Sequence, residues 1–280
     1  MALPAFLVLF FIMYVPMSGL VLAFKNFDYS KGIFGSDWAG LGNFEFLIKS
    51  KDTFLNMTRN TVLYYLLFTA VGTLLNIVIA ICIDQLAFKK MAKTMQTLMI
   101  IPVFISYAAV QFIVFAFIDS RTGLINNVLG TRTRFYSTAS YWPWILLIVK
   151  VWKDTGYGSV LYMSVLSGID TSLYEAADID GATQWQQFTN ITFPSIKPIL
   201  AIDAVLIITG SLKYYDLIAV MTAGGPNHAT EVMSTYMYYS AFNILRYGYS
   251  SAIGVILLIL CMLLGRLEIF PVAMLLAPGV

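Results

Sequence analysis

The sequence contains little charge, one histidine and two cysteines. Asp, Glu, Lys and Arg make up 11% of its 280 residues, and the net charge is +2, too small to indicate binding to nucleic acid. His228 is the single histidine, which excludes a histidine-rich metal site and disfavours a His-based catalytic triad. Cys82 and Cys261 both fall in expected membrane spans, so neither a disulfide framework nor a metal cluster is supported.

The sequence also lacks the Gly-x4-Gly-Lys-Ser/Thr pattern, whose backbone cradles nucleotide phosphates. Any ATP chemistry must therefore belong to a partner chain. A nucleophile–base constellation and metal-ligand spacing are absent as well. We expect neither an enzyme nor a bound cofactor.

Apolar residues dominate what is present. The chain is 59% hydrophobic, with a mean hydropathy of +0.78, more than a soluble core of this size needs. Several stretches are long enough to cross hydrocarbon as helices. We predict an all-α polytopic membrane protein with six transmembrane helices, at residues 1–24, 60–83, 94–118, 141–166, 195–221 and 247–265.

The third expected span and the loop that precedes it each carry an informative feature. Lys89, Lys90 and Lys93 fall in a short loop at residues 84–93, which the positive-inside rule places in the cytoplasm. Pro102 is expected to bend the span that follows. Counted over all loops, however, Lys and Arg are more numerous on the opposite side, so charge alone does not set the orientation.

The fourth span carries charged residues, which are costly in a membrane and usually face a cavity or a partner helix. Lys150 and Asp154 are four residues apart and are expected to pair on one face, which continues to Tyr157 and Leu161. Two interpretations stay open: a structural ion pair that locks helix packing, and a substrate path.

The fifth span adds further charges and two tyrosines. Aromatic faces and hydrogen-bonding groups suit a carbohydrate, because sugar rings present apolar C–H faces and many hydroxyls. The tyrosines could equally be packing residues or interfacial anchors. The candidate path residues in the two spans are Lys150, Lys153, Asp154, Tyr157, Asp203, Lys213, Tyr214, Tyr215 and Asp216.

A polar segment at residues 172–198 lies between these spans. Ser172 and Glu175 have the spacing of a capping box, so we expect a helix to begin near Leu173. Gly181 is placed to end that helix in the left-handed conformation.

A second short helix is expected at residues 182–190, with Trp185 and Phe188 exposed on one side. Pro194 and Pro198 then fit the start of the next span, where a missing backbone N–H is tolerated. The segment is thus predicted to project two short helices into water at a membrane face.

The order Glu175-Ala176-Ala177, Gly181, then Ile191-Thr192-Phe193-Pro194 resembles the EAA signature of ATP-binding-cassette (ABC) importer permeases, EAA-x3-G-x9-I-x-L-P. Phe193 departs from the usual Leu. In that family the loop is a cytoplasmic coupling helix that docks into a cleft on the ATPase; the alternative is an ordinary cytoplasmic loop. The resemblance implies ATPase-coupling roles for Glu175, Ala176, Ala177, Asp180, Gly181, Ile191 and Pro194.

Two further segments are similar to elements of sugar permeases. Residues 38–44 resemble W-x-G-x-x-N-F, and residues 222–230 resemble T-x-G-G-P-x-x-x-T. An interfacial loop with aromatic anchors and a tight external turn are the alternatives. The resemblance implies contacts with a binding protein at Asn43, Gly224, Gly225 and Pro226.

The chain as a whole resembles the maltose-transporter permease group, and more narrowly bacterial oligosaccharide permeases such as those for alginate and rhamnogalacturonan fragments. The resemblance implies a second related permease as a heterodimer partner, two ATPase subunits that bind ATP and Mg, and an extracytoplasmic solute-binding protein. It also implies a carbohydrate substrate, contact with membrane lipid, and a multi-pass place in the bacterial cell membrane.

We expect one permease domain at residues 1–268, with the coupling loop at about residues 167–198 and an atypical, unassigned tail at residues 269–280. Two alternatives to a carbohydrate permease stay open. One is an ion- or proton-coupled secondary transporter or channel that uses Lys150, Asp154, Asp203 and Asp216. The other is an ABC importer permease for a non-sugar solute.

Overall fold

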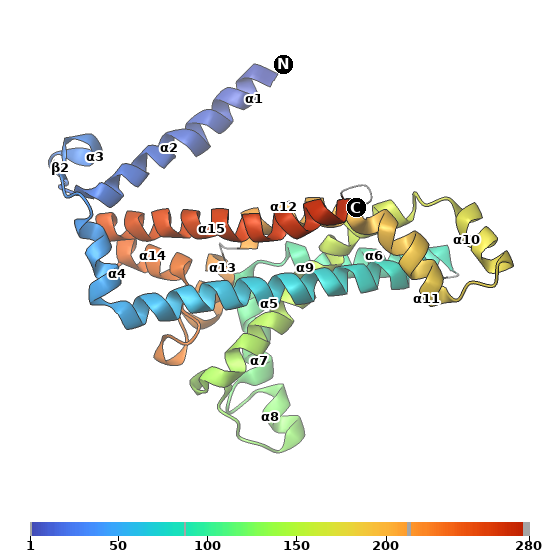
Figure 1. The fold of residues 1–280 in the computed structure, drawn as a ribbon. Helices are drawn as coiled ribbons and strands as arrows, with labels where there is room; N and C mark the ends of the chain where they lie inside the picture. The colour runs from blue at the N-terminus through green and yellow to red at the C-terminus, as the bar shows by residue number, and fades with distance from the viewer. Residues whose placement is uncertain (1, 87, 212–213, 277–280) are drawn as a thin grey trace.

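The computed structural model describes residues 2–86, 88–211 and 214–276. These residues form helices, apart from one short antiparallel hairpin of β1 (Lys25–Asn26) and β2 (Asp37–Trp38). The predicted all-α class is confirmed. Figure 1 shows long helices laid side by side, with the hairpin near one end of the bundle and short helices projecting from the other.

The N-terminal helix stands away from this bundle (Figure 1). It is built from α1 (Ala2–Leu9), a π-helical turn (Phe10–Tyr14), α2 (Val15–Met17) and a 3₁₀ segment (Ser18–Phe24). Large apolar side chains along it are exposed within this chain, as expected of a segment in contact with lipid or another protein. Three short helices follow: α3 (Gly32–Gly35), a 3₁₀ turn (Gly42–Phe44) and α4 (Glu45–Lys49).

Two of the long helices exceed their predicted bounds. α5 (Lys51–Asp84) begins at residue 51 instead of 60, and its 34 residues rise about 51 Å, more than hydrocarbon about 30 Å thick. Its first turns can therefore lie outside the bilayer and carry charge. α15 (Tyr247–Leu276) continues past Arg266 to Leu276, so most of the expected tail extends this helix.

The third expected span is broken instead of merely bent. α6 (Lys89–Ile100) and a 3₁₀ turn (Ile101–Phe104) meet α7 (Tyr107–Ile118) at 101°. The break lies at residues 105–106, directly after the 3₁₀ turn that contains Pro102, which lacks the N–H that would continue the α-helix. The lysines expected in a loop belong to α6. Beyond α7 come α8 (Leu124–Leu129) and two 3₁₀ turns (Phe135–Ser137 and Ala139–Tyr141).

The helix predicted at residues 141–166 is present as α9 (Trp142–Leu166), whereas the helix expected for the fifth span is divided. α12 (Phe193–Ser211) and α13 (Tyr215–Thr222) are separate helices around residues 212–213, which lie outside the described part. A 3₁₀ turn (Pro226–His228) and α14 (Met233–Phe242) then lead to α15.

Among the described residues, three helices are long and apolar enough to cross a membrane: Phe6–Phe24, Lys51–Asp84 and Tyr247–Arg266. The bent pair Lys89–Phe104 and Tyr107–Ile118 makes a fourth if it is one span. The chain is therefore built to cross a membrane several times, and the count of six stays a prediction.

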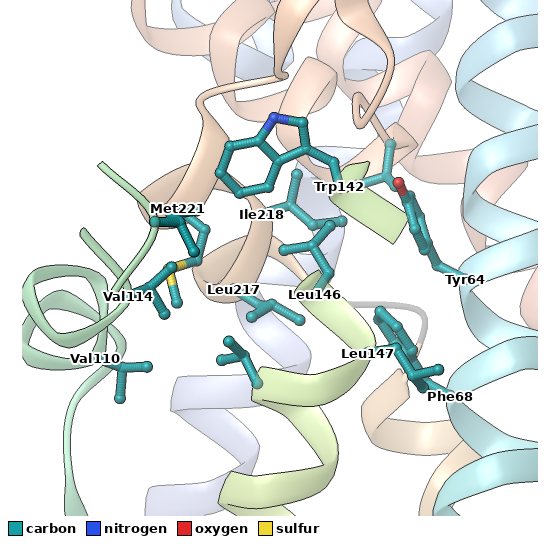
Figure 2. Close-up of a cluster of buried hydrophobic side chains, with 13 residues drawn as sticks. Tyr64, Phe68, Val110, Val114, Trp142, Leu146, Leu147, Leu217, Ile218 and Met221 are labelled. Atoms are coloured by element: carbon teal, nitrogen blue, oxygen red, sulfur yellow. The ribbon is translucent and has the colours of Figure 1, made fainter. Parts of the chain in front are cut away.

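The largest buried apolar cluster joins α5, α7, α9 and α13. Figure 2 shows Tyr64 and Phe68 of α5 beside Leu146 and Leu147 of α9, with Ile218 of α13 close to Leu146. Trp142 is buried at the start of α9. This packing fixes α9 against α5 and α13, the three helices that form most of the cavity described next.

Candidate functional site: a membrane cavity and a coupling elbow

A cavity of about 420 Å³ lies among α5, α9, α12 and α13. Six of the nine candidate path residues line it, although they come from two predicted spans. Leu161, expected on the same face of α9, lines it too. The six are Lys150, Asp154, Tyr157, Asp203, Tyr214 and Asp216.

The predicted ion pair on α9 is confirmed, because the ammonium of Lys150 donates to the carboxylate of Asp154. The same ammonium nitrogen lies 5.4 Å from the ring centroid of Tyr214, a cation–π distance. Lys150 thus links α9 to the residue preceding α13. Both interpretations of the pair stay open. Lys150 contributes to helix packing through Tyr214, and both members of the pair line the cavity.

Asp203 is buried on α12, and its Oδ2 accepts a hydrogen bond of 2.5 Å from the hydroxyl of Tyr162. This bond ties α12 to α9, the two helices that flank the polar segment. Tyr162 is not among the predicted site residues. Nothing in the sequence distinguishes it from the other tyrosines of an aromatic-rich chain.

Two described path residues, Lys153 and Tyr215, do not line the cavity. Lys153 is buried, and its Nζ donates to the carbonyl oxygens of Pro102, Val103 and Ile105 at 3.1, 2.7 and 2.5 Å. The ammonium of Lys153 thus supplies hydrogen-bond donors to the backbone carbonyls beside the helix break. Tyr215 packs instead on Tyr238, with ring centroids 4.7 Å apart. Lys213 lies outside the described residues.

α5 contributes cavity residues that the sequence analysis missed, because its span is uncharged. Thr69, Thr73 and Asn76 follow one another at helical spacing and line the cavity with Phe68. Polar residues four and three positions apart share a helix face, so this spacing is the signal that could have found them. Tyr107, at the start of α7, adds an aromatic ring.

Glycines let α9 approach its neighbours closely. A Cβ at Gly156 would lie 1.8 Å from the carbonyl oxygen of Met99 on α6, and one at Gly158 would lie 2.3 Å from the amide of Asn76 on α5. α9 is therefore held tightly against both helices at the level of the cavity.

The polar segment folds into two short helices at the end of the bundle away from the hairpin (Figure 1), which we call the coupling elbow (residues 167–192). Its first helix, α10 (Thr171–Ile179), ends as predicted at Gly181, whose φ is +73°. The N–H groups of Gly181 and Ala182 bond the carbonyls of Asp178 and Ala177, a Schellman motif.

The predicted start of α10 is wrong. Asp170 caps the helix, since its carboxylate accepts from the backbone N–H of Ser172 at 3.0 Å. Hydrogen bonds from the backbone N–H and the side chain of Ser172 hold the pKa of Asp170 below its usual value. With the cap at Asp170, Ser172 lies inside the helix, so its predicted capping box with Glu175 does not form.

The second helix does not stop at residue 190. α11 (Gln184–Gln187) begins with a capping box between Thr183 and Gln186 and passes through a π-helical turn (Phe188–Thr192) into α12. This π-helical turn, which is wider than an α-helical turn, ends two residues before Pro194. Pro198 lies inside α12. Trp185 and Phe188 share one side as predicted, with rings stacked 5.3 Å apart, but Phe188 is partly buried where exposure was expected.

The elbow presents apolar side chains on its surface. Leu173, Ile179 and Trp185 are exposed, Ile179 by 86% and Trp185 by 70%. Of the predicted coupling residues, Ala177 and Ile191 are partly buried, and the exposed ones are Glu175, Ala176, Asp180, Gly181 and Pro194.

At the hairpin end, the amide of Asn43 donates to the carbonyls of Leu22, Ala23 and Lys25, at 3.3, 3.1 and 2.9 Å. Its donor capacity is thus used inside the chain, where it ties the N-terminal helix to the hairpin. Gly224 and Gly225 adopt φ of +97° and +70°, so the turn has the unusual backbone expected of it.

His228 follows this turn and is exposed, as expected of a solvated residue, and its Nδ1 lies 3.1 Å from the carboxylate of Glu231. Burial raises the pKa of Glu231, and His228 opposes that shift. The amide of Asn60 on α5 donates to the carbonyls of Ala229 and Glu231, both at 3.0 Å, which fixes the loop on the bundle.

Comparison with known proteins supports a transport role. The family model described as "Binding-protein-dependent transport system inner membrane component" matches residues 87–268. The polygalacturonan/rhamnogalacturonan transport system permease protein YteP of Bacillus subtilis (strain 168) is 29% identical over 276 residues, which cover 95% of this chain and 86% of the relative. The lactose transport system permease protein LacF of Rhizobium radiobacter is 25% identical, covering 78% and 75%.

A solved structure of a bacterial ABC transporter involved in the import of the acidic polysaccharide alginate has a chain with the same fold. Its TM-score is 0.88 at 27% identity, covering 99% of this chain and 94% of that one. With several helices suited to crossing a bilayer, the chain is a multi-pass membrane protein. It belongs to the family of inner membrane components of binding-protein-dependent transport systems.

Proposed function

We propose that this chain is one permease subunit of an ABC importer and forms, with a second related permease, the pathway for uptake of an oligosaccharide. The observation that carries the proposal is the arrangement of α9 and α12. The two helices line the cavity, and the coupling elbow directly joins them. The curated relatives named above transport carbohydrates, which supports a sugar as the substrate.

ATP hydrolysis belongs, in this proposal, to two separate ATPase subunits that bind ATP and Mg. They would lie on the cytoplasmic side of a bacterial inner membrane, against the elbow. The exposed Ile179 and Trp185 supply the apolar contact, and Gly181 gives the backbone its sharp turn. Nucleotide binding can shift the permease only through contacts that differ between its states, and the elbow provides those contacts.

The elbow transmits that movement because it is stiff. The hydroxyls of Tyr174 and Thr192 lie 2.9 Å apart, and the amide of Gln187 donates to Asp178 at 2.5 Å. These bonds join α10 to the π-helical turn and α11. Motion imposed on α10 therefore reaches α9 and α12 together, and these helices open the cavity alternately to each side.

A solute-binding protein would deliver the sugar at the opposite end, near the turn at residues 224–226. A solved structure supports such a partner: the alginate importer with a periplasmic protein bound to alginate pentasaccharide, whose matched chain has a TM-score of 0.87 and 27% identity. Asn43 would act there indirectly, by fixing the hairpin.

The test is uptake of a labelled oligosaccharide into proteoliposomes that contain both permeases, the ATPases and the binding protein. We expect uptake that requires internal ATP and stops when the ATPases are left out. Uptake that continues without ATPase would contradict the proposal.

An ion-coupled transporter is the second candidate, favoured by the carboxylates of Asp154, Asp203 and Asp216 around one cavity. Uptake driven by a pH or sodium gradient in the absence of ATP would establish it. An importer of the same class for a non-sugar solute would show ATP-dependent uptake but no response to any sugar.

A further inference from the structure

Among the described residues, the charges that face the cavity are unbalanced. Its described lining includes three carboxylates, on Asp154, Asp203 and Asp216, and one ammonium, on Lys150. This charge imbalance affects which sugars the cavity accepts, an inference that rests on the proposed function.

The one described ammonium of the lining is already engaged. Lys150 donates to Asp154 and lies over the ring of Tyr214. Lys153, three residues on, is directed to the carbonyls of the helix break, and its ammonium is not available to the cavity. Among the described residues, this half of the pathway therefore offers a substrate no free cation.

The carboxylates differ in how far they are engaged. Asp203 accepts from Tyr162, and Asp154 accepts from Lys150. Asp216, in the first turn of α13, is exposed to the cavity and has no hydrogen-bond partner among the described residues. No described residue of this chain therefore occupies its oxygens, which can accept hydrogen bonds.

This chemistry discriminates between sugars. The hydroxyl groups of a neutral sugar donate hydrogen bonds to carboxylates. Its C–H faces stack on aromatic rings such as those of Tyr107 and Tyr157, which also line the cavity. A uronic acid places its own carboxylate in the same low-dielectric space, where like charges a few ångströms apart repel strongly. Recognition of a carboxylate calls for Arg or Lys donors.

We propose that the cavity of this chain is selective for an uncharged oligosaccharide and rejects uronate oligosaccharides. The substrate would then differ from the acidic polysaccharides named for the solved alginate importer and for the Bacillus subtilis relative. The fold and elbow would be shared, and the difference would lie in a few charged side chains around the cavity.

The first test measures ATP-dependent uptake by the complete importer of neutral hexose, galacturonate, mannuronate and glucosamine oligosaccharides of equal length. We expect the neutral sugars to exceed the uronates by about tenfold or more. Equal or faster uptake of a uronate would overturn this inference and leave the proposed function intact. Preference for the cationic glucosamine series would overturn it as well. Absence of ATP-dependent uptake of every sugar would overturn the proposed function, and this inference with it.

The second test separates the cavity from the binding protein by measuring direct binding of the same sugars to the purified permease–ATPase complex. Asp216→Arg should raise the ratio of uronate to neutral affinity by about tenfold, because it replaces a carboxylate of the lining by a cation. Asp52→Arg, at an exposed acidic residue in the first turn of α5, is the matched control and should leave the ratio unchanged.

Asp216→Asn should move the ratio in the same direction by a smaller factor, and it decides the outcome if the arginine variant does not assemble. An unchanged ratio in a folded Asp216 variant would contradict the assigned role of cavity charge.

Discussion

The ammonium nitrogen of Lys153 on α9 lies 2.7 Å from the carbonyl oxygen of Val103, in the break between α6 and α7. A proline-induced break leaves carbonyl oxygens without intrahelical donors, and buried unsatisfied carbonyls are costly. Lys153 supplies those donors from a neighbouring helix. The charge that looked like part of a substrate path therefore maintains a bend of 101° beside the cavity.

Replacing Lys153 by methionine should destabilise the protein strongly. Buried carbonyls would lose their donor, at a cost of about 2–4 kcal/mol in unfolding free energy. Thermal unfolding of the detergent-purified protein measures the effect. Lys49→Met, at an exposed lysine paired with the exposed Glu45, is the control and should change the melting temperature little. Similar melting temperatures for the two variants would refute the role given to Lys153.

Gly156→Ala should disrupt the contact between α9 and α6. The added methyl group would overlap the backbone carbonyl of Met99, so the helices must separate, at a cost of about 1–3 kcal/mol. Gly72→Ala on α5 is the matched control, since a Cβ there meets no atom within 4 Å and alanine favours the helix by about 1 kcal/mol. A Gly156→Ala protein with unchanged stability would show that the helices do not approach so closely.

Gly181 allows a test of docking apart from folding. Its φ is positive, but a Cβ there would meet open space in this chain. Asparagine tolerates the left-handed conformation, so Gly181→Asn should keep α10 capped and retain most uptake. Gly181→Glu, bulky and acidic, should abolish uptake while the protein still inserts in the membrane. Wild-type transport by the glutamate variant would refute the coupling role.

The pH dependence of stability should carry a signature of Glu231. Its pKa is raised by burial, so the native state holds this proton more tightly than the unfolded chain. The resulting stability is complete below the usual carboxyl pKa and is lost as pH rises through the raised native value. The melting temperature should therefore fall between pH 4 and pH 8, and the fall should be smaller in the Glu231→Gln variant. An identical slope in that variant would contradict the assignment.

The sequence predicted the elements whose signals are local. Lys150 and Asp154 pair because their spacing on one helix dictates it, and Gly181 terminates α10 because the left-handed conformation suits glycine. The start of α10 was predicted two residues late. Asp170 and Ser172 are both good caps, and local spacing does not show which of them the backbone uses.

What the sequence could not supply depends on contacts between distant residues. Lys153 and Asp154 are adjacent in an apolar stretch, yet one faces a helix break about fifty residues away and the other the cavity. The contribution of α5 was hidden because threonine and asparagine on one face hardly lower the hydropathy of a long span. The fifth span is divided where the described backbone of Tyr214 leaves the helical conformation, with ψ of +38°.

The most direct test of the central claim is a cross-linking measurement at Ala177. Cys82 and Cys261 would be replaced by serine, and Ala177→Cys would be compared with Leu41→Cys, at an exposed residue near the hairpin. We predict that the thiol of the Ala177→Cys variant cross-links to an ATPase subunit and reacts with an impermeant thiol reagent only from the cytoplasmic side. The thiol of the Leu41→Cys variant should react only from outside. Labelling of the Ala177→Cys variant from outside, or no ATPase cross-link in the assembled importer, would contradict the account.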